Sequence, residues 1–254
     1  MELWQDQGIV LSARPHGESG AIVSILTENY GRSAGYIRGA QSSRQRGIIE
    51  PGSLVGARWS ARSEGQLGTF TLEQDRNMAA GIMDDPLPLA AMLSACALCD
   101  AALPEREAHP GLFHGMIALM ESLGTDIWGA AYIMWEIALM RELGFALDLS
   151  RCAANGDPMT IEWVSPKSGH AVSLAAGEPY KDKLLPLPAF LKPVRGGADD
   201  EEVMKGLRMT SYFLEHWIFN HHTKGIPEQR LRFQERFARH IGDVTISESN
   251  GTQG

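Results

Sequence analysis

Three arginines separated by glycine, serine and glutamine form the segment of this chain best suited to bind phosphate. Arg38, Arg44 and Arg46 lie in the stretch Arg-Gly-Ala-Gln-Ser-Ser-Arg-Gln-Arg-Gly, residues 38–47. A guanidinium group presents a planar fork of donors that matches two phosphate oxygens, and glycine and serine let backbone N–H groups come close to a phosphate. The segment favours a phosphate-binding loop; a solvated flexible loop that is arginine-rich by chance is the alternative.

The charge around this segment is opposite to that of the whole chain. The 254 residues carry a formal net charge of −8, which on average repels a polyanion. Between Arg32 and Arg62, however, six arginines stand against a single acid, Glu50, so this window carries +5 and the rest of the chain −13. Because attraction to phosphates depends on the field within about one Debye length, roughly 8–10 Å, the window can hold a nucleic acid. We therefore add Arg32, Arg58 and Arg62 to the candidate binding residues.

Aromatic residues accompany the arginines. Tyr36, Trp59 and Phe70 lie on segments that we predict to be strands. Unpaired bases stack on such rings in proteins that bind single strands, with about 1–3 kcal/mol for each base. A small barrel also needs large rings in its core, and for any one of the three we favour packing by about two to one. Tyr36 is included among the candidate DNA-binding residues.

Cysteine and histidine occur once in a spacing that imitates a metal site. Cys96 and Cys99 are followed by His109 and His114. Both cysteines fall within an Ala/Leu/Met-rich helical pattern in which no turn brings the thiolates together, so we interpret them as core residues. The histidine pair 221–222 is interpreted as a helix end stabilised by the helix dipole. Since P-loop, H-E-x-x-H and G-x-S-x-G patterns are also absent, we predict no catalytic site, metal or cofactor, and a protein that is not an enzyme.

Composition restricts the compartment and the size of the fold. The first six residues are acidic where a secretory signal would be basic and then apolar, and no run of about 18 apolar residues occurs. Three cysteines, an odd number, cannot form a complete set of disulfides. We expect a cytoplasmic protein with no membrane partner, built from two modest domains.

The first part of the chain has the strand pattern of a small barrel. Short apolar segments alternate with glycine, proline and asparagine turns as far as residue 74. The five predicted strands are 8–12, 21–26, 33–38, 54–59 and 67–72. Five short strands in about 70 residues are typical of an OB-like barrel, whose face and loops commonly bind nucleic acid.

Beyond residue 80 the apolar period changes from two to about 3.6, which predicts a mainly helical domain. The first helix is expected to be capped by Asp84-Asp85, with Pro86 or Pro88 in its first turn, and to run through Leu89 to Leu103. Further helices are expected over 112–123 and 127–143, from Asp199-Asp200 to about 225, and after Pro227. The stretch from residue 150 to 195 is rich in Gly, Pro and Ser and is expected to be an inserted irregular module with one β-like piece at 160–164. The predicted fold is α+β, with domains 1–79 and 80–247 and a disordered tail, 248–254.

Several short motifs then occur in an order and spacing that resemble the RecO family over nearly the whole chain. In the barrel they are Gly8-Ile9-Val10-Leu11, Arg14-Pro15-His16-Gly17-Glu18, residues 26–32, and Arg38-Gly39-Ala40 with Arg44 and Arg46. In the helical body they are residues 103–107 with His109-Pro110, 142–149, and 211–216.

The resemblance implies an OB-fold joined to a helical domain in a protein that binds single- and double-stranded DNA and anneals complementary strands. It also implies two protein partners, RecR and the C-terminal tail of the single-stranded DNA-binding protein, with which the family helps to load the recombinase on coated DNA. In this family Arg38, Arg44 and Arg46 correspond to DNA-contacting residues. Two other functions stay open from the residues alone, a protein interaction adaptor and an RNA-binding OB-fold protein.

The inserted module departs from the family pattern. Many relatives carry two C-x-x-C pairs there, whereas here Cys152 is followed by Ala-Ala-Asn and the region expected to hold the second pair, 165–170, offers only His170. One thiol and one imidazole are too few for a closed tetrahedral zinc site, so we predict that residues 150–195 are a degenerate zinc module without metal. Its shape is then expected to depend on the packing of Trp163, Val164, Val172 and Leu174.

Overall fold

The computed structural model describes residues 2–63, 65–154, 156–194 and 196–251. The chain divides into two compact units. The first is Met1–Gly124 with Pro227–Arg230, and the second is Thr125–Ile226 with Leu231–Gly254.

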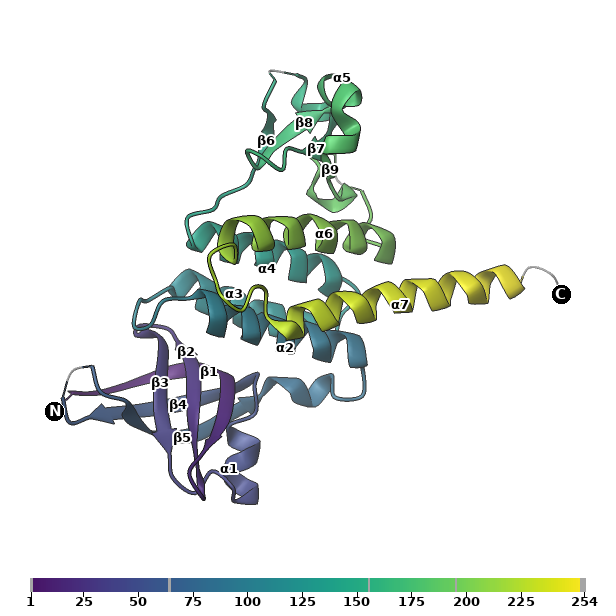
Figure 1. Cartoon of the computed structure of the whole chain (residues 1–254). Helices are drawn as coiled ribbons and strands as arrows, with labels where there is room; N and C mark the ends of the chain where they lie inside the picture. Colours follow the sequence, from purple (N-terminus) through teal and green to yellow (C-terminus); the bar gives the residue numbers. More distant parts are fainter. Residues whose placement is uncertain (1, 64, 155, 195, 252–254) are drawn as a thin grey trace. The chain divides into compact units, whose positions relative to one another are not determined.

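The first unit contains the five predicted strands, closed into a barrel in the order β1-β2-β3-β5-β4 (Figure 1). The strands are β1 (Glu2–His16), β2 (Gly20–Thr27), β3 (Gly31–Ile37), β4 (Ser53–Ala61) and β5 (Gly68–Asn77). All neighbours are antiparallel except β3 and β5, which pair in parallel over only two positions. This order, with a helix between β3 and β4, confirms the predicted OB-like barrel and the α+β class.

Period-two alternation produces the barrel core. Along β3, buried residues alternate with half-buried ones. Trp59 and Phe70 point inward and are only 1% and 3% exposed, which confirms the packing interpretation for these two rings. The Trp59 indole N–H donates to the Ala34 carbonyl at 3.0 Å, so the buried ring leaves no donor unsatisfied.

The arginine-rich segment differs from the predicted loop, because part of it is a short helix, α1 (Ser43–Ile48). The Ser42 hydroxyl accepts a hydrogen bond from the Gln45 N–H at 3.3 Å and caps the helix. Ile48 and Ile49 at the other end are buried in the barrel core. The cap and the anchor together order a segment whose composition alone suggests flexibility.

Two helices complete the first unit, α2 (Pro86–Ala102) and α3 (Pro110–Ser122). The Asp85 carboxylate accepts from the Leu87 N–H at 3.1 Å with proline in the first turn, as predicted for this helix start. α2 packs on β1 and β2. Because both helices group with the barrel, this compact unit extends beyond residues 1–79, and the boundary at residue 79 stays a prediction.

The second unit is built on α4 (Trp128–Glu142) and α6 (Asp200–Phe213), which lie side by side (Figure 1). Asp199 caps α6 by accepting from the Glu202 N–H at 2.9 Å, and a π-helical turn, Leu214–Ile218, follows it. α7 (Glu228–Gly251) places Phe233 and Phe237 in the core. The predicted disordered tail covers residues 248–254. Its last three residues, 252–254, lie outside the described residues, while α7 extends through Gly251. Disorder of the tail therefore stays a prediction.

The inserted module is more regular than predicted, since it forms a four-stranded sheet in the order β6-β8-β7-β9. Its elements are β6 (Asp148–Cys152), β7 (Ile161–Val164), β8 (His170–Ser173), β9 (Leu185–Pro186) and the short helix α5 (Leu174–Gly177). Strands of two to five residues are too short to show a period in sequence. Val164 and Val172 are buried as expected, but Leu174 is 51% exposed and does not hold the module together.

No helix within the described ranges has both the length and the apolar character needed to cross a bilayer.

Candidate nucleic-acid interface

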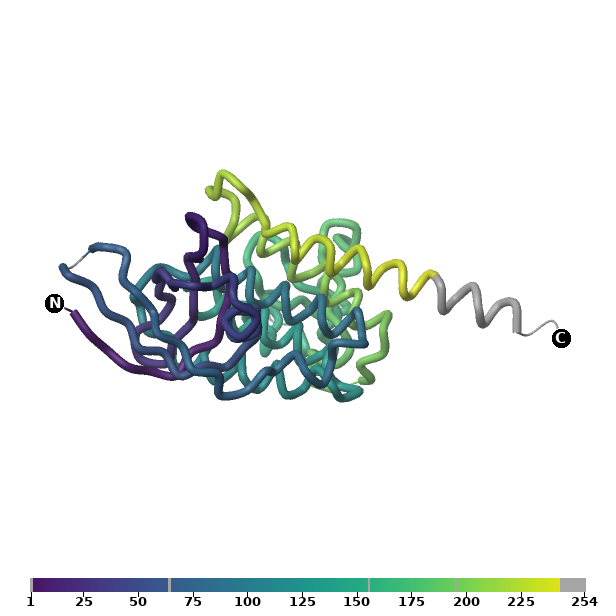
Figure 2. Tube along the Cα trace, turned by 90° about the horizontal axis from the view of Figure 1, so that it is seen from below, coloured from purple at the N-terminus to yellow at the C-terminus, as the bar shows by residue number. Residues whose placement is uncertain are grey.

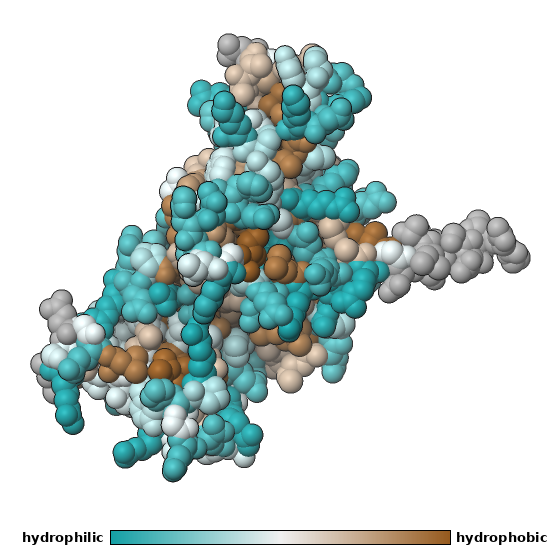
Figure 3. All heavy atoms as spheres, in the orientation of Figure 1, coloured by the Kyte–Doolittle hydropathy of each residue, from teal (hydrophilic) through white to brown (hydrophobic). Residues whose placement is uncertain are grey.

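Three of the predicted binding arginines lie on consecutive segments around α1. Arg38 directly follows β3, and Arg44 and Arg46 lie on α1 itself. All three side chains are exposed, and none has a hydrogen bond or ion pair with any residue that the structure describes. Figure 2 looks from below onto this part of the barrel, and in Figure 3 hydrophilic side chains project from it. These guanidinium groups keep their full capacity to bind phosphate oxygens.

Tyr36 lies on the outer face of the barrel, unlike Trp59 and Phe70. The strand register puts it in one row with Arg14, Ile22 and Thr69. The ring is half-buried and lies against the backbone of Gly20, where an added Cβ would come within 2.2 Å of the Tyr36 hydroxyl oxygen. The His16 ring meets Tyr36 edge-on, with 6.1 Å between the ring centres, and the outward position of Tyr36 is suited to base stacking.

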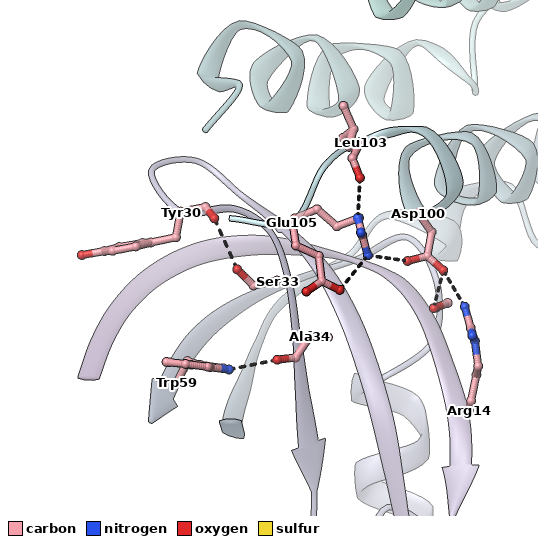
Figure 4. Close-up of polar contacts among 10 residues, drawn as sticks. Arg14, Tyr30, Ser33, Ala34, Trp59, Asp100, Leu103 and Glu105 are labelled. Atoms are coloured by element: carbon pink, nitrogen blue, oxygen red, sulfur yellow. Dashed lines mark hydrogen bonds and ion pairs between the residues drawn. The ribbon is translucent and has the colours of Figure 1, made fainter. Parts of the chain in front are cut away.

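Arg32 differs from the other predicted binding residues because its donors are already engaged. Its Nε donates to the Leu103 carbonyl at 2.8 Å, and Nη1 lies 3.7 Å from Asp100 and 3.5 Å from Glu105 (Figure 4). Asp100 on α2 also accepts from the Ser12 hydroxyl at 2.8 Å and pairs with Arg14 at 3.1 Å. The side chain of Arg32 is only 17% exposed, so its charge is compensated inside the first unit. Its contacts join β3 to α2.

Arg58 and Arg62 lie away from α1, on β4 and just after it. Arg58 is exposed. Its Nη2 and Nε donate to the Gln5 side-chain oxygen at 2.9 and 3.2 Å, with the amide oxygen and nitrogen of Gln5 assigned so that the oxygen faces these donors. Around it is a hollow of about 380 Å³ whose lining includes two acids, Asp6 and Glu73. Arg62 has no partner among the described residues, and the described residues that line its own hollow include no acid.

Residues 103–107, which we call the strap, close the side of the barrel where β3 and β5 diverge. The Arg106 N–H donates to the Arg32 carbonyl at 2.8 Å, and Glu105 makes a parallel bridge to the same residue. The Arg106 guanidinium lies 4.9 Å from the centre of the Trp59 ring and donates to the Gln66 carbonyl at 3.4 Å. Arg106 has a φ of 61°, the one non-glycine residue with positive φ among those described. Sequence periodicity gave no sign of the strap, since it is neither helix nor strand.

The inserted module does not bring metal-ligating side chains together. Cys152 lies beside Ser173, not beside the 165–170 region expected to hold the second pair, while His170 is exposed and stands in register with Asp148. Within the described part of the chain, no three His, Cys, Asp or Glu side chains converge as a metal site requires. Cys96 and Cys99 are fully buried in α2, as the core interpretation predicts.

Because only one thiol is present in the module, we expect the purified protein to contain no stoichiometric zinc. Dialysis against a strong chelator should leave the melting temperature unchanged, since a structural zinc would contribute several kcal/mol that removal would abolish. Elemental analysis measures the metal and calorimetry measures the melting temperature. One tightly held zinc per chain would overturn this expectation.

The Cys152 thiol should titrate near neutral pH. Burial by itself raises its pKa, but hydrogen bonds from the Ser173 hydroxyl and from the N–H groups of Ser173, Ala154 and Gly156 stabilise the thiolate and lower the pKa from 9.0 to about 7. The rate of alkylation by iodoacetamide should therefore reach half its maximum near pH 7, because the thiolate is the nucleophile. The associated stabilisation is complete above pH 9.0 and is lost as the pH falls through about 7.

The other two cysteines serve as internal controls for this titration. Burial raises the pKa of Cys96 to about 12, and that of Cys99 is raised as well. Mass spectrometry of the alkylated folded protein should find label on Cys152 alone. A half-maximal rate near pH 9.0 would mean that the four hydrogen bonds do not form in solution.

The chain combines a five-stranded OB-like barrel, which carries a basic short helix, with a helical part that contains a small inserted sheet. It is thus an OB-barrel protein with a helical body. The family model described as "Recombination protein O N terminal" matches residues 1–74, and the one described as "Recombination protein O C terminal" matches residues 83–225. The chain belongs to the RecO family.

Relatives over nearly the full length agree with the family models. The DNA repair protein RecO of Rhodospirillum centenum is 51% identical over 238 residues, which are 93% of this chain and 95% of the relative. The protein of the same name from Caulobacter vibrioides is 47% identical, covering 92% and 97%. That of Rhodospirillum rubrum is 44% identical, covering 93% and 96%.

Proposed function

We propose that this chain is a DNA repair and recombination mediator that binds single- and double-stranded DNA and anneals complementary strands in the cytoplasm without catalysing a reaction. The observation that supports this most directly is the group of exposed, unpaired arginines around α1, next to an outward-facing Tyr36. Phosphate contacts by Arg38, Arg44 and Arg46 supply attraction that is indifferent to base sequence, and Arg62 adds to it. Arg58 contributes less because acids share its hollow.

The proposed partners are RecR and the tail of the single-stranded DNA-binding protein, with which the chain would help to load the recombinase on coated DNA. Membership of the RecO family supports both partners. We assign the tail to the helical part, because amphipathic helices form grooves that accept short apolar peptides.

Filter binding with labelled oligonucleotides at several salt concentrations tests the proposal. Binding to single- and double-stranded DNA with a salt-dependent affinity supports it, as does faster annealing of complementary strands. Retention of RNA in preference to DNA would favour an RNA-binding protein. No retention of either nucleic acid would favour a protein interaction adaptor and would remove the proposed function.

A further inference from the structure

The outer side of α4 is apolar from its first turn almost to its last. Between Ile127 and Met140 the sequence contains one charged residue, Glu136, whose side chain is fully buried. The Tyr132 and Thr210 hydroxyls donate to the Glu136 carboxylate, so this charge belongs to the core of the second unit. Helical spacing gathers the remaining apolar side chains on the opposite side, which we call the α4 stripe: Ile127, Ala130, Ala131, Met134, Ile137 and Ala138.

The α4 stripe faces solvent in the described chain. Ile127 is 65% exposed and Met134 is 55% exposed, while the other members of the stripe are half-buried. α6 packs against a different side of α4, where an added Cβ at Gly129 would come within 2.8 Å of Val203. A helix on the surface of a protein normally carries polar and charged residues on its outer face. The α4 stripe instead has the composition of a contact surface.

Two charges of opposite sign stand at the two ends of the stripe. Asp126 precedes Ile127, and Arg141 lies beyond Ala138 on the same side of α4. Both are exposed, and neither has a hydrogen bond or ion pair with a residue that the structure describes. Met134 lies midway, seven residues after Ile127 and seven before Arg141. An identical helix, turned end over end about Met134, would therefore set its Arg141 beside Ile127 and Asp126.

We propose that the α4 stripe is a self-association surface, on which a second copy of this chain docks with its own α4 antiparallel. Met134 would face Met134 of the other copy at the two-fold axis, and Arg141 would meet Asp126 of the other copy at both ends. The three alanines of the stripe leave room for the two helices to approach closely. The inference goes beyond the proposed function and does not depend on DNA binding.

Charge and size determine which occupant and what strength we expect. An acidic peptide or an anionic membrane surface would be attracted by Arg141 but repelled by Asp126, whereas a second copy satisfies both charges. The stripe from Ile127 to Arg141 is about 21 Å long. A contact along one helix is smaller than the standard interface of about 1,600 Å², so the dimer should be weak and should depend on protein concentration.

The first test compares Met134→Glu with Met159→Glu by sedimentation velocity of the full chain, from low to high micromolar protein. Met159 lies in the inserted module and is 58% exposed, and both substitutions change the net charge from −8 to −9. Met134→Glu should weaken dimerisation by at least about tenfold, because it sets two carboxylates against each other at the two-fold axis. Met159→Glu should match the parent, and circular dichroism melting checks that both variants fold.

A charge exchange tests the antiparallel arrangement. Asp126→Arg and Arg141→Asp, each made alone, should weaken dimerisation about three- to tenfold, because like charges then face each other at both ends of the stripe. The double variant restores opposite charges and should recover the dissociation constant of the parent. This recovery cannot come from an effect of either substitution on folding, because the double variant contains both.

Three results would overturn the proposal. One is a parent chain that stays monomeric at high micromolar concentration. Another is a parent dimer that Met134→Glu leaves intact, or a double variant that dimerises no better than the single ones. The third is a monomeric parent that binds the tail peptide of the single-stranded DNA-binding protein and loses it in Met134→Glu, which would assign the α4 stripe to that peptide. In each case DNA binding by the parent would still support the proposed function.

Discussion

Replacing Arg38, Arg44 and Arg46 together with alanine should flatten the dependence of single-strand affinity on salt. If each guanidinium neutralises one phosphate, the slope of log K against log salt should fall by about 0.7 for each residue, roughly 2 units in all. Affinity at low salt should fall about ten- to a hundredfold, since three exposed charge contacts contribute roughly 1.5–3 kcal/mol together. The loss should be largely the same for all base sequences, and strand annealing should decline with it.

The same variant should fold normally. The three side chains are exposed and have no hydrogen-bond or ion-pair partner among the residues that the structure describes. Exposed substitutions usually change the free energy of unfolding by no more than about 0.5 kcal/mol each. Melting followed by circular dichroism checks this beside the titration. A collapsed melting curve would show that the arginines hold α1 in place.

A matched control separates local charge from net charge. The control replaces three exposed arginines of the second unit with alanine: Arg151, Arg208 and Arg239. Like the α1 variant, it changes the net charge from −8 to −11. If binding depends on the field near α1, this control should keep the parent's salt slope. Equal losses in both variants would mean that net charge, and not a site at α1, governs DNA binding.

The barrel was predictable because its signals are local. Alternation of apolar residues and the turn residues between them determine five strands, and the core follows from which side chains fall on the inner face. For Trp59 and Phe70 the sequence allowed either a core or a surface position. The two residues pair across β4 and β5 and are buried, so both belong to the core. Tyr36 is on the outer face because it falls between the buried positions of β3, Gly35 and Ile37. Side chains alternate between the two faces of a strand, so a shift of one residue in the register would have turned Tyr36 inward.

The candidate site was less predictable because it depends on contacts far apart in sequence. Arg32 looks like any other arginine of the basic window until Asp100, 68 residues later, is found 3.7 Å from it. The strap has no periodicity, and its conformation comes from contacts with β3, Trp59 and the β4–β5 loop. In the inserted module the β-like piece predicted at 160–164 is strand β7, but the other three strands were not predicted, since they contain at most five residues.

Replacing Gly31 with alanine should destabilise the protein by about 3–5 kcal/mol, a large part of the 5–15 kcal/mol typical of a folded domain. Gly31 has a φ of 64°, and the added Cβ would lie 1.9 Å from the Glu107 carbonyl oxygen and 2.4 Å from its carbonyl carbon. These are backbone atoms at the end of the strap, so no side-chain rotation relieves the overlap. The strap would have to leave β3, with loss of the Arg106 contacts to Trp59 and Gln66.

Gly39→Ala provides the control that isolates this contact. Gly39 has nearly the same φ, 66°, but an added Cβ there meets nothing within 4 Å. Its alanine variant should lose only the cost of the left-handed conformation, about 1–2 kcal/mol. The difference between the two variants in urea unfolding therefore measures the packing of the strap on the turn between β2 and β3. Equal losses in Gly31→Ala and Gly39→Ala would mean that the strap does not lie against this turn in solution.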